Sequence, residues 1–142
     1  MLTVISNLLT ALLQLLKQNH LLAKDYQSHL LYERLQDGID QDIDRVKEIA
    51  LACGYDDSIA DADNSSIEAS EVLDNYPDIV SIEKQIIKEI NNIIATLNST
   101  ENESFDGVFN EYTAKEAIIN MLGDIAEKRT RDIYLLRFGG KI

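Results

Sequence analysis

The chain has 142 residues, enough for one domain with a hydrophobic core, and its single Pro and six Gly favour a helical protein. The formal net charge of −12 disfavours broad binding to nucleic acid or to an anionic membrane and suits a protein that attracts cations. Because Cys53 is the single cysteine, an intrachain disulfide is excluded and a cytoplasmic location is expected. We treat residues 1–142 as one domain.

Residues 2 to 23 are predicted to form the first helix, with His20 near its end. The first 16 residues are uncharged, but they lack the basic start and small-residue cleavage site of a secretory signal. Polar residues interrupt them, whereas a membrane span needs about 20 apolar residues. We therefore expect no membrane segment. The breadth of apolar surface predicts a helix buried on two faces, one of them against a neighbouring chain.

A second helix is predicted to follow a short break at residues 24–26 and to continue to about residue 53, where Gly54 stands in a capping position. One face carries an apolar stripe of Leu31, Leu35, Ile39, Ile43, Val46, Ile49 and Cys53. The opposite face, within an arc of roughly 100°, carries His29, Glu33, Asp37, Asp40, Asp44 and Glu48.

The polar face is mirrored about a point beside Gly38. In a straight helix His29 and Glu48 are roughly 28 Å apart, so one chain cannot close a metal site with both ends. Two copies crossing antiparallel at Gly38 bring opposite ends together, which predicts two equivalent metal sites across a two-fold interface. The alternative interpretation of this polar face is an ordinary acidic helix surface that is exposed to solvent and binds no metal. A Gly within a helix costs about 1 kcal/mol relative to Ala, and close approach of two backbones is one reason to keep it.

The later segments contain two capping boxes and a polar turn. Residues 55–75 form an acidic stretch in which a short helix is predicted to start at 65–68. A long helix is predicted to open at residues 75–78 and to continue to about 97, followed by a polar turn at 98–106. The last helix is capped at 113–116 and stops after 138 at two Gly. Four long helices with a small helix in the middle connection predict an all-α four-helix bundle with a long crossover.

Imidazole and carboxylate ligands suit iron, manganese or zinc. The usual di-iron bundle needs two Glu-x-x-His motifs within one subunit, and neither His20 nor His29 lies in such a motif. Cys53 continues an apolar stripe and is predicted to be buried rather than catalytic.

Three motifs together resemble the Dps family of mini-ferritins. They are Gln18-Asn-His20, His29-x3-Glu33 and Asp44-x3-Glu48 followed by Gly54, and the small helix before Asn75-Tyr76-Pro77 adds weaker support. The likeness extends from about residue 8 to residue 138. This chain has Glu33 where the family usually has Asp, Leu21 where it commonly has Trp, and a shorter loop between the two His.

The resemblance implies a ferritin-like bundle in a hollow dodecamer built from two-fold dimers. His20, His29 and Glu33 of one subunit would bind iron together with Asp44 and Glu48 of its partner, at a di-iron or mononuclear ferroxidase site that zinc or manganese can also occupy. Family members oxidise Fe(II), commonly with hydrogen peroxide, and store the ferric mineral. The resemblance also implies acidic three-fold pores, for which Asp106, Glu111 and Glu116 are the candidates.

Two other functions stay open. One is a non-catalytic DNA-compacting protein, although Lys17 is the only basic residue before residue 24 and an N-terminal DNA-binding tail is not expected. A basic cluster lies near the C-terminus: Lys128, Arg129, Arg131, Arg137 and Lys141. We expect most of it to serve helix-end electrostatics and pairs such as Asp124–Lys128 and Glu127–Arg131. The other is a cage with a structural metal such as zinc.

Overall fold

A computed structural model describes residues 2–54, 58–60, 66–99 and 112–142, and within these residues every regular element is a helix: six α-helices and a short 3-10 helix at 58–60. The α-helices are α1 (Leu2–Leu22), α2 (Tyr26–Gln36), α3 (Ile39–Ala52), α4 (Ser66–Asn75), α5 (Ile79–Ser99) and α6 (Tyr112–Phe138). The predicted all-α class is confirmed. None of the helices in the described part of the chain is long and apolar enough to cross a membrane.

Most helix ends agree with the capping signals of the sequence. Asp78 accepts a hydrogen bond from the Ser81 amide at 2.7 Å and so caps the start of α5. Gly54, which follows α3, has a φ of 90°, the left-handed conformation expected after a helix. The helix α6 begins at Tyr112, one residue before the predicted cap Thr113. Ser65, the predicted cap of α4, lies outside the described residues.

The prediction of one continuous second helix is wrong. The helix breaks between Gln36 and Ile39, and Gly38 has a φ of 83° at the start of α3. Residues other than Gly avoid this left-handed conformation, which explains Gly at this position. The group closest to Gly38 is Lys128 of the same chain, whose Nζ lies 2.6 Å from the place that a Cβ would occupy. A crossing of two chains is therefore not needed to explain Gly38.

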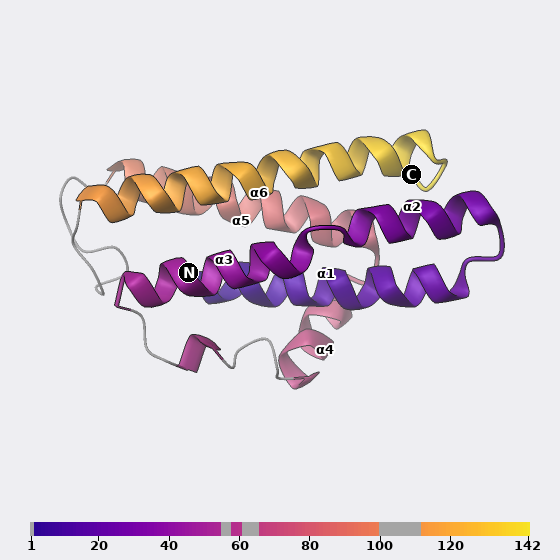
Figure 1. The fold of residues 1–142 in the computed structure, drawn as a ribbon, viewed down its shortest axis with the longest axis horizontal. Coiled ribbons are helices and arrows are strands. Elements are labelled where there is room, and N and C mark those ends of the chain that lie inside the picture. Colours follow the sequence, from indigo (N-terminus) through magenta and orange to yellow (C-terminus); the bar gives the residue numbers. More distant parts are fainter. Residues whose placement is uncertain (1, 55–57, 61–65, 100–111) are drawn as a thin grey trace.

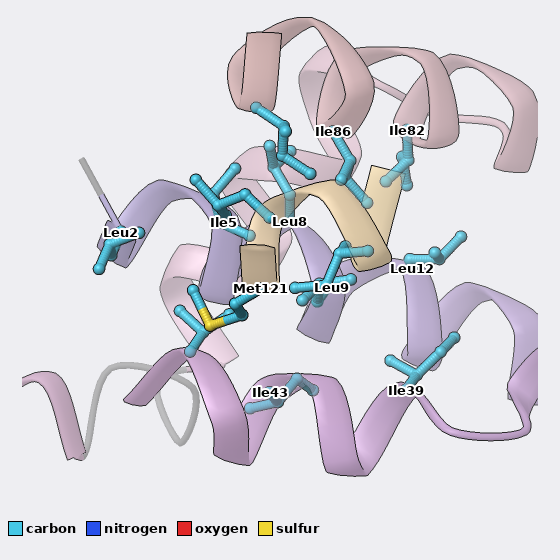
Figure 2. Close-up of a cluster of buried hydrophobic side chains, with 14 of the residues drawn as sticks. Leu2, Ile5, Leu8, Leu9, Leu12, Ile39, Ile43, Ile82, Ile86 and Met121 are labelled. Atoms are coloured by element: carbon cyan, nitrogen blue, oxygen red, sulfur yellow. The ribbon is translucent and has the colours of Figure 1, made fainter. Parts of the chain in front are cut away.

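The long elements run side by side as a helical bundle, with α2 and α3 following one another along the same edge (Figure 1). The helix α1 packs against α2, α3, α4 and α5, and α6 packs against α5, α3 and α2. Apolar side chains from α1, α3, α5 and α6 meet between them (Figure 2), including Leu9, Ile39, Ile86 and Met121. Most of the predicted stripe on α2 and α3 is buried, and so is Cys53, as predicted.

Helices of the same chain cover most of the apolar side chains of α1. Its nine buried residues face these helices, since α1 packs against four other elements. Val4, Leu21 and Leu22 remain 45%, 80% and 67% exposed. The expected contact of a second face of α1 with a neighbouring chain stays a prediction.

Charged residues occupy part of the core between α5 and α6. Glu83 and Arg129 are fully buried and Asp132 is 5% exposed. Arg129 Nε lies 3.4 Å from Glu83 Oε2, and Arg129 Nη2 lies 3.0 Å from Asp132 Oδ2. Arg129 was expected to serve mainly helix-end electrostatics with the other basic residues near the C-terminus, but it forms ion pairs inside the core instead. Of the predicted pairs, Glu127–Arg131 is present at 3.9 Å, whereas Asp124 pairs with Arg45 at 3.3 Å.

Candidate metal centre

Three of the five predicted ligands meet where α1 ends and α2 begins. One potential ligand atom from each of His20, His29 and Glu33 lies within 4.8 Å of the other two. Both imidazoles are half-buried and Glu33 is exposed. Among the described residues, this is the one group of three or more His, Cys, Asp or Glu side chains that is compact enough to hold a metal ion.

The turn between α1 and α2 positions the second His. Asp25 caps α2 by accepting a hydrogen bond from the Ser28 amide at 2.9 Å, and the Asp25 carbonyl accepts from the His29 amide at 3.1 Å. The hydrogen bonds from Ser28 hold the pKa of Asp25 below its ordinary value. Because His29 and Glu33 are four residues apart on α2, they project from the same side of the helix.

The hydrogen bonds of His29 define its tautomer. Its Nδ1 lies 3.1 Å from the His20 carbonyl oxygen, which can only accept, so this nitrogen carries the hydrogen. In the neutral ring the Nε2 lone pair of His29 then accepts a hydrogen bond from His20 Nε2 at 3.0 Å, and a metal ion bound by both nitrogens would replace this hydrogen. A backbone carbonyl that holds one ring nitrogen commonly orients the other toward a metal.

The spacing of the two imidazoles fits a shared metal ion. Two nitrogens bound at about 2.1 Å and at right angles to each other are about 3.0 Å apart, which matches the Nε2–Nε2 distance of 3.0 Å. Ligands on opposite sides of such an ion are about 4.2 Å apart, so the group needs only a small contraction from its 4.8 Å limit. The exposed Glu33 can supply this movement by rotation of its side chain.

The other two predicted ligands do not join this group. Asp44 and Glu48 lie on α3, beyond the break at Gly38, and both side chains are exposed. The helices α2 and α3 follow one another along one edge of the bundle (Figure 1). The two imidazoles and Glu33 lie where α1 meets α2, whereas Asp44 and Glu48 belong to α3.

Of the three predicted pore residues, Glu116 is exposed near the start of α6. Asp106 and Glu111 lie outside the described residues.

A contact that the sequence did not indicate joins the C-terminal residues to α2. Lys141 donates a hydrogen bond from Nζ to Ser28 Oγ at 2.6 Å and lies 5.7 Å from the centre of the Tyr32 ring. Ser28 and Tyr32 flank His29 in the sequence, so this contact helps to fix the first turns of α2. No local motif marks it, because 113 residues separate the two bonded side chains.

Comparison with protein-family models, with curated proteins and with solved structures finds no match for this chain. Its function must therefore be inferred from its own residues and their arrangement.

Proposed function

We propose that the chain is the subunit of a ferritin-like cage of the Dps type that oxidises Fe(II) with hydrogen peroxide and stores the ferric product. In this proposal His20, His29 and Glu33 of one subunit bind iron together with Asp44 and Glu48 of a two-fold-related partner. The cage has twelve subunits and acts in the cytoplasm. Iron is the substrate, and zinc or manganese can compete for the same ligands.

The observation that carries the proposal is the division of the ligands into two groups. Two imidazoles and a carboxylate converge within 4.8 Å, while Asp44 and Glu48 stay exposed on another helix. Three protein ligands leave an ion open to further donors. A second chain with its α3 against α2 can provide two carboxylates, and two-fold symmetry then creates two equal sites. Neither Gly38 nor the apolar breadth of α1 is needed for this arrangement.

The ligand types explain why electron loss is favoured. Carboxylate oxygens are hard donors and stabilise Fe(III) relative to Fe(II), while the two imidazoles retain the ferrous ion before oxidation. Two Fe(II) ions each give one electron to hydrogen peroxide, which takes up two protons and leaves as two water molecules. Removing both reactants together suppresses the formation of hydroxyl radicals.

Iron has to enter a closed cage, and the net charge of −12 favours the approach of cations. We propose that Asp106, Glu111 and Glu116 line acidic pores at three-fold axes. Clustered carboxylates of this kind raise the local concentration of Fe(II) at the cost of mutual repulsion.

The assembly is tested by the native mass. We expect a closed species of twelve subunits in light scattering. A stable species near the 16.0 kDa of a single chain would contradict the shared site.

The activity is tested with the double variant Asp44→Ala and Glu48→Ala. We expect fast peroxide-dependent Fe(II) oxidation to fall by at least about a hundredfold, as for loss of direct metal ligands. The variant should fold, because both side chains are exposed. A matched control, Glu71→Ala with Asp74→Ala, removes two exposed carboxylates from α4 and should keep the parent rate. Parent rates in the first variant would refute the site.

Two further measurements distinguish the proposed function from the structural-metal and DNA-compacting alternatives. A purified cage that binds zinc and gives no turnover with Fe(II) and peroxide has a structural metal. A gel shift with duplex DNA at physiological salt, in a protein without iron oxidation, indicates DNA compaction instead.

A further inference from the structure

We propose that Glu83 and Asp132 hold one proton between them beside Arg129, and that loss of this proton as the pH rises opens the contact between α5 and α6. The inference does not depend on the proposed iron chemistry. It concerns a pH-sensitive element in the core of the bundle.

The three side chains form a closed group in the interior. Arg129 bridges the two carboxyl groups, at 3.4 Å to Glu83 Oε2 and 3.0 Å to Asp132 Oδ2. Glu83 and Arg129 are fully buried and Asp132 is 5% exposed. Within the described residues, neither Glu83 oxygen, nor Asp132 Oδ2, nor a side-chain nitrogen of Arg129 makes a hydrogen bond of good geometry. The carboxyl groups of Glu83 and Asp132 lie close enough for one to donate a hydrogen bond to the other once it is protonated. Two carboxylates and one guanidinium carry a net charge of −1, which is costly in a site that is almost entirely buried.

One proton removes this net charge. With a shared proton, the group contains one carboxylic acid, one carboxylate and one guanidinium, and it is neutral. Two carboxyl groups that share a buried site do not both ionise at ordinary pH. Burial raises the pKa of Glu83 well above its ordinary value and also raises the pKa of Asp132, in spite of the nearby Arg129.

Two further cations on α6 act on the pair. Lys128 lowers the pKa of both carboxyl groups and Arg131 lowers that of Asp132, but burial outweighs both effects. The helix α1, which also packs against α5, buries only apolar side chains and Ser6. From the α2–α3 side, the negative charge of Asp42 acts on Lys128 and Arg129, and that of Asp37 acts on Lys128.

Asp132 also connects the group to solvent. It lines a cavity of about 380 Å³ with Arg34, Asp37, Gly38, Lys128 and Arg131, among other residues. Protons can therefore reach the pair without unfolding of the bundle.

The direction of the pH dependence follows from proton linkage. The unfolded carboxyl groups ionise near pH 4, whereas the folded pair keeps a proton to higher pH. The stability from this proton is complete below the unfolded pKa and decreases as the pH rises toward the folded pKa. Between these limits the unfolding equilibrium constant increases tenfold per pH unit from this one proton.

The first test is the infrared band of a protonated carboxylic acid in the native protein at neutral pH. We expect the band in the parent and its loss in both Glu83→Gln and Asp132→Asn, because either change leaves one carboxylate paired with Arg129. Absence of the band in the parent, or its persistence in both variants, would overturn the proposal.

The second test measures urea unfolding from pH 5 to 9 at a fixed protein concentration. Relative to the parent, Glu83→Gln should remove a slope of about one proton from the dependence of the unfolding constant on pH. The control Glu127→Gln removes an exposed carboxylate from α6 and should keep the parent slope. Equal slopes in the parent and in Glu83→Gln would contradict the proposed proton. If Glu83→Gln does not fold, loss of the infrared band in Asp132→Asn still decides the question.

Discussion

The charged cluster between α5 and α6 and the His-containing cluster at the junction of α1 and α2 differ in whether the chain supplies its own cation. Between α5 and α6, Arg129 is fully buried between Glu83 and Asp132. At the junction of α1 and α2, the imidazoles of His20 and His29 meet Glu33 near the surface. Among the described residues, no Lys or Arg forms an ion pair with Glu33.

The difference separates a structural group from a binding site. A buried carboxyl group needs a partner within the fold, since the cost of its desolvation is large. An exposed carboxylate stays hydrated, so its desolvation cost is small and it can remain unpaired until it binds a cation from solution. The buried cluster is therefore complete in one chain, whereas the His-containing cluster is open to an external ion.

The largest effect is expected when the buried cluster loses its cation. Arg129→Met should destabilise the protein by about 3–5 kcal/mol at pH 7, because it leaves two buried carboxyl groups without their partner. The loss should shrink at lower pH, where both carboxyl groups can be protonated. Urea unfolding at pH 5 and pH 7 provides the measurement. A variant as stable as the parent at pH 7 would show that Arg129 is not needed to balance the buried carboxyl groups.

A smaller effect is expected when the open cluster receives its own cation. Glu33→Arg should weaken Co²⁺ binding by at least about tenfold, because it removes a ligand and places a positive charge beside both imidazoles. Titration of the metal-free protein with Co²⁺ tests this expectation. Glu33→Gln is the matched control and should weaken binding less, since it removes the negative charge without adding a positive one. Equal affinities of these two variants would argue against an open cation site.

The smallest effect concerns Gly38, which separates the helix bearing His29 from the helix bearing Asp44. Gly38→Ala should cost about 1–2 kcal/mol of stability, because its φ of 83° is unfavourable for Ala. The flexible end of Lys128 must also move. Gly123→Ala is a control of opposite sign: nothing lies within 4 Å of the added Cβ, so the change should stabilise α6 by up to about 1 kcal/mol. Unchanged stability in Gly38→Ala would mean that the break can become helical.

Helical periodicity predicted the described elements well, because each carries its own apolar stripe and often its own cap. The capping signal before α5 and the stop after α6 are local features that a single sequence displays. The ligand spacing also predicted the pairing of His29 with Glu33, since residues four apart on one helix share a face. The approach of His20 needed the tertiary turn at Asp25.

The break at Gly38 was missed because the apolar stripe continues through it. Leu35 and Ile39 are both fully buried on opposite sides of the break. The periodicity of apolar residues therefore predicts which face of the segment is buried. The left-handed conformation of Gly38 depends on the tertiary structure, in which the end of Lys128 lies beside it.

The buried charges had a signal that could have been recognised. Arg129 and Asp132 interrupt a core series on α6 with alternating spacings of four and three residues: Ile118, Leu122, Ile125, Arg129, Asp132 and Leu136. Glu83 occupies a corresponding position in α5 between Ile79 and Ile86. Opposite charges at core positions of two helices predict a buried pair. The pairing of the helices themselves depends on tertiary structure.

The most direct test of a site shared between chains uses mixed assemblies of a His29→Ala subunit and an Asp44→Ala subunit. Each variant alone damages every site, so each homogeneous assembly should lack fast Fe(II) oxidation with hydrogen peroxide. In a mixed two-fold pair, one site carries both changes and the other is intact. Random mixing in equal amounts should therefore restore about a quarter of the parent sites. No recovery in mixed assemblies of confirmed composition would contradict a site built from two chains.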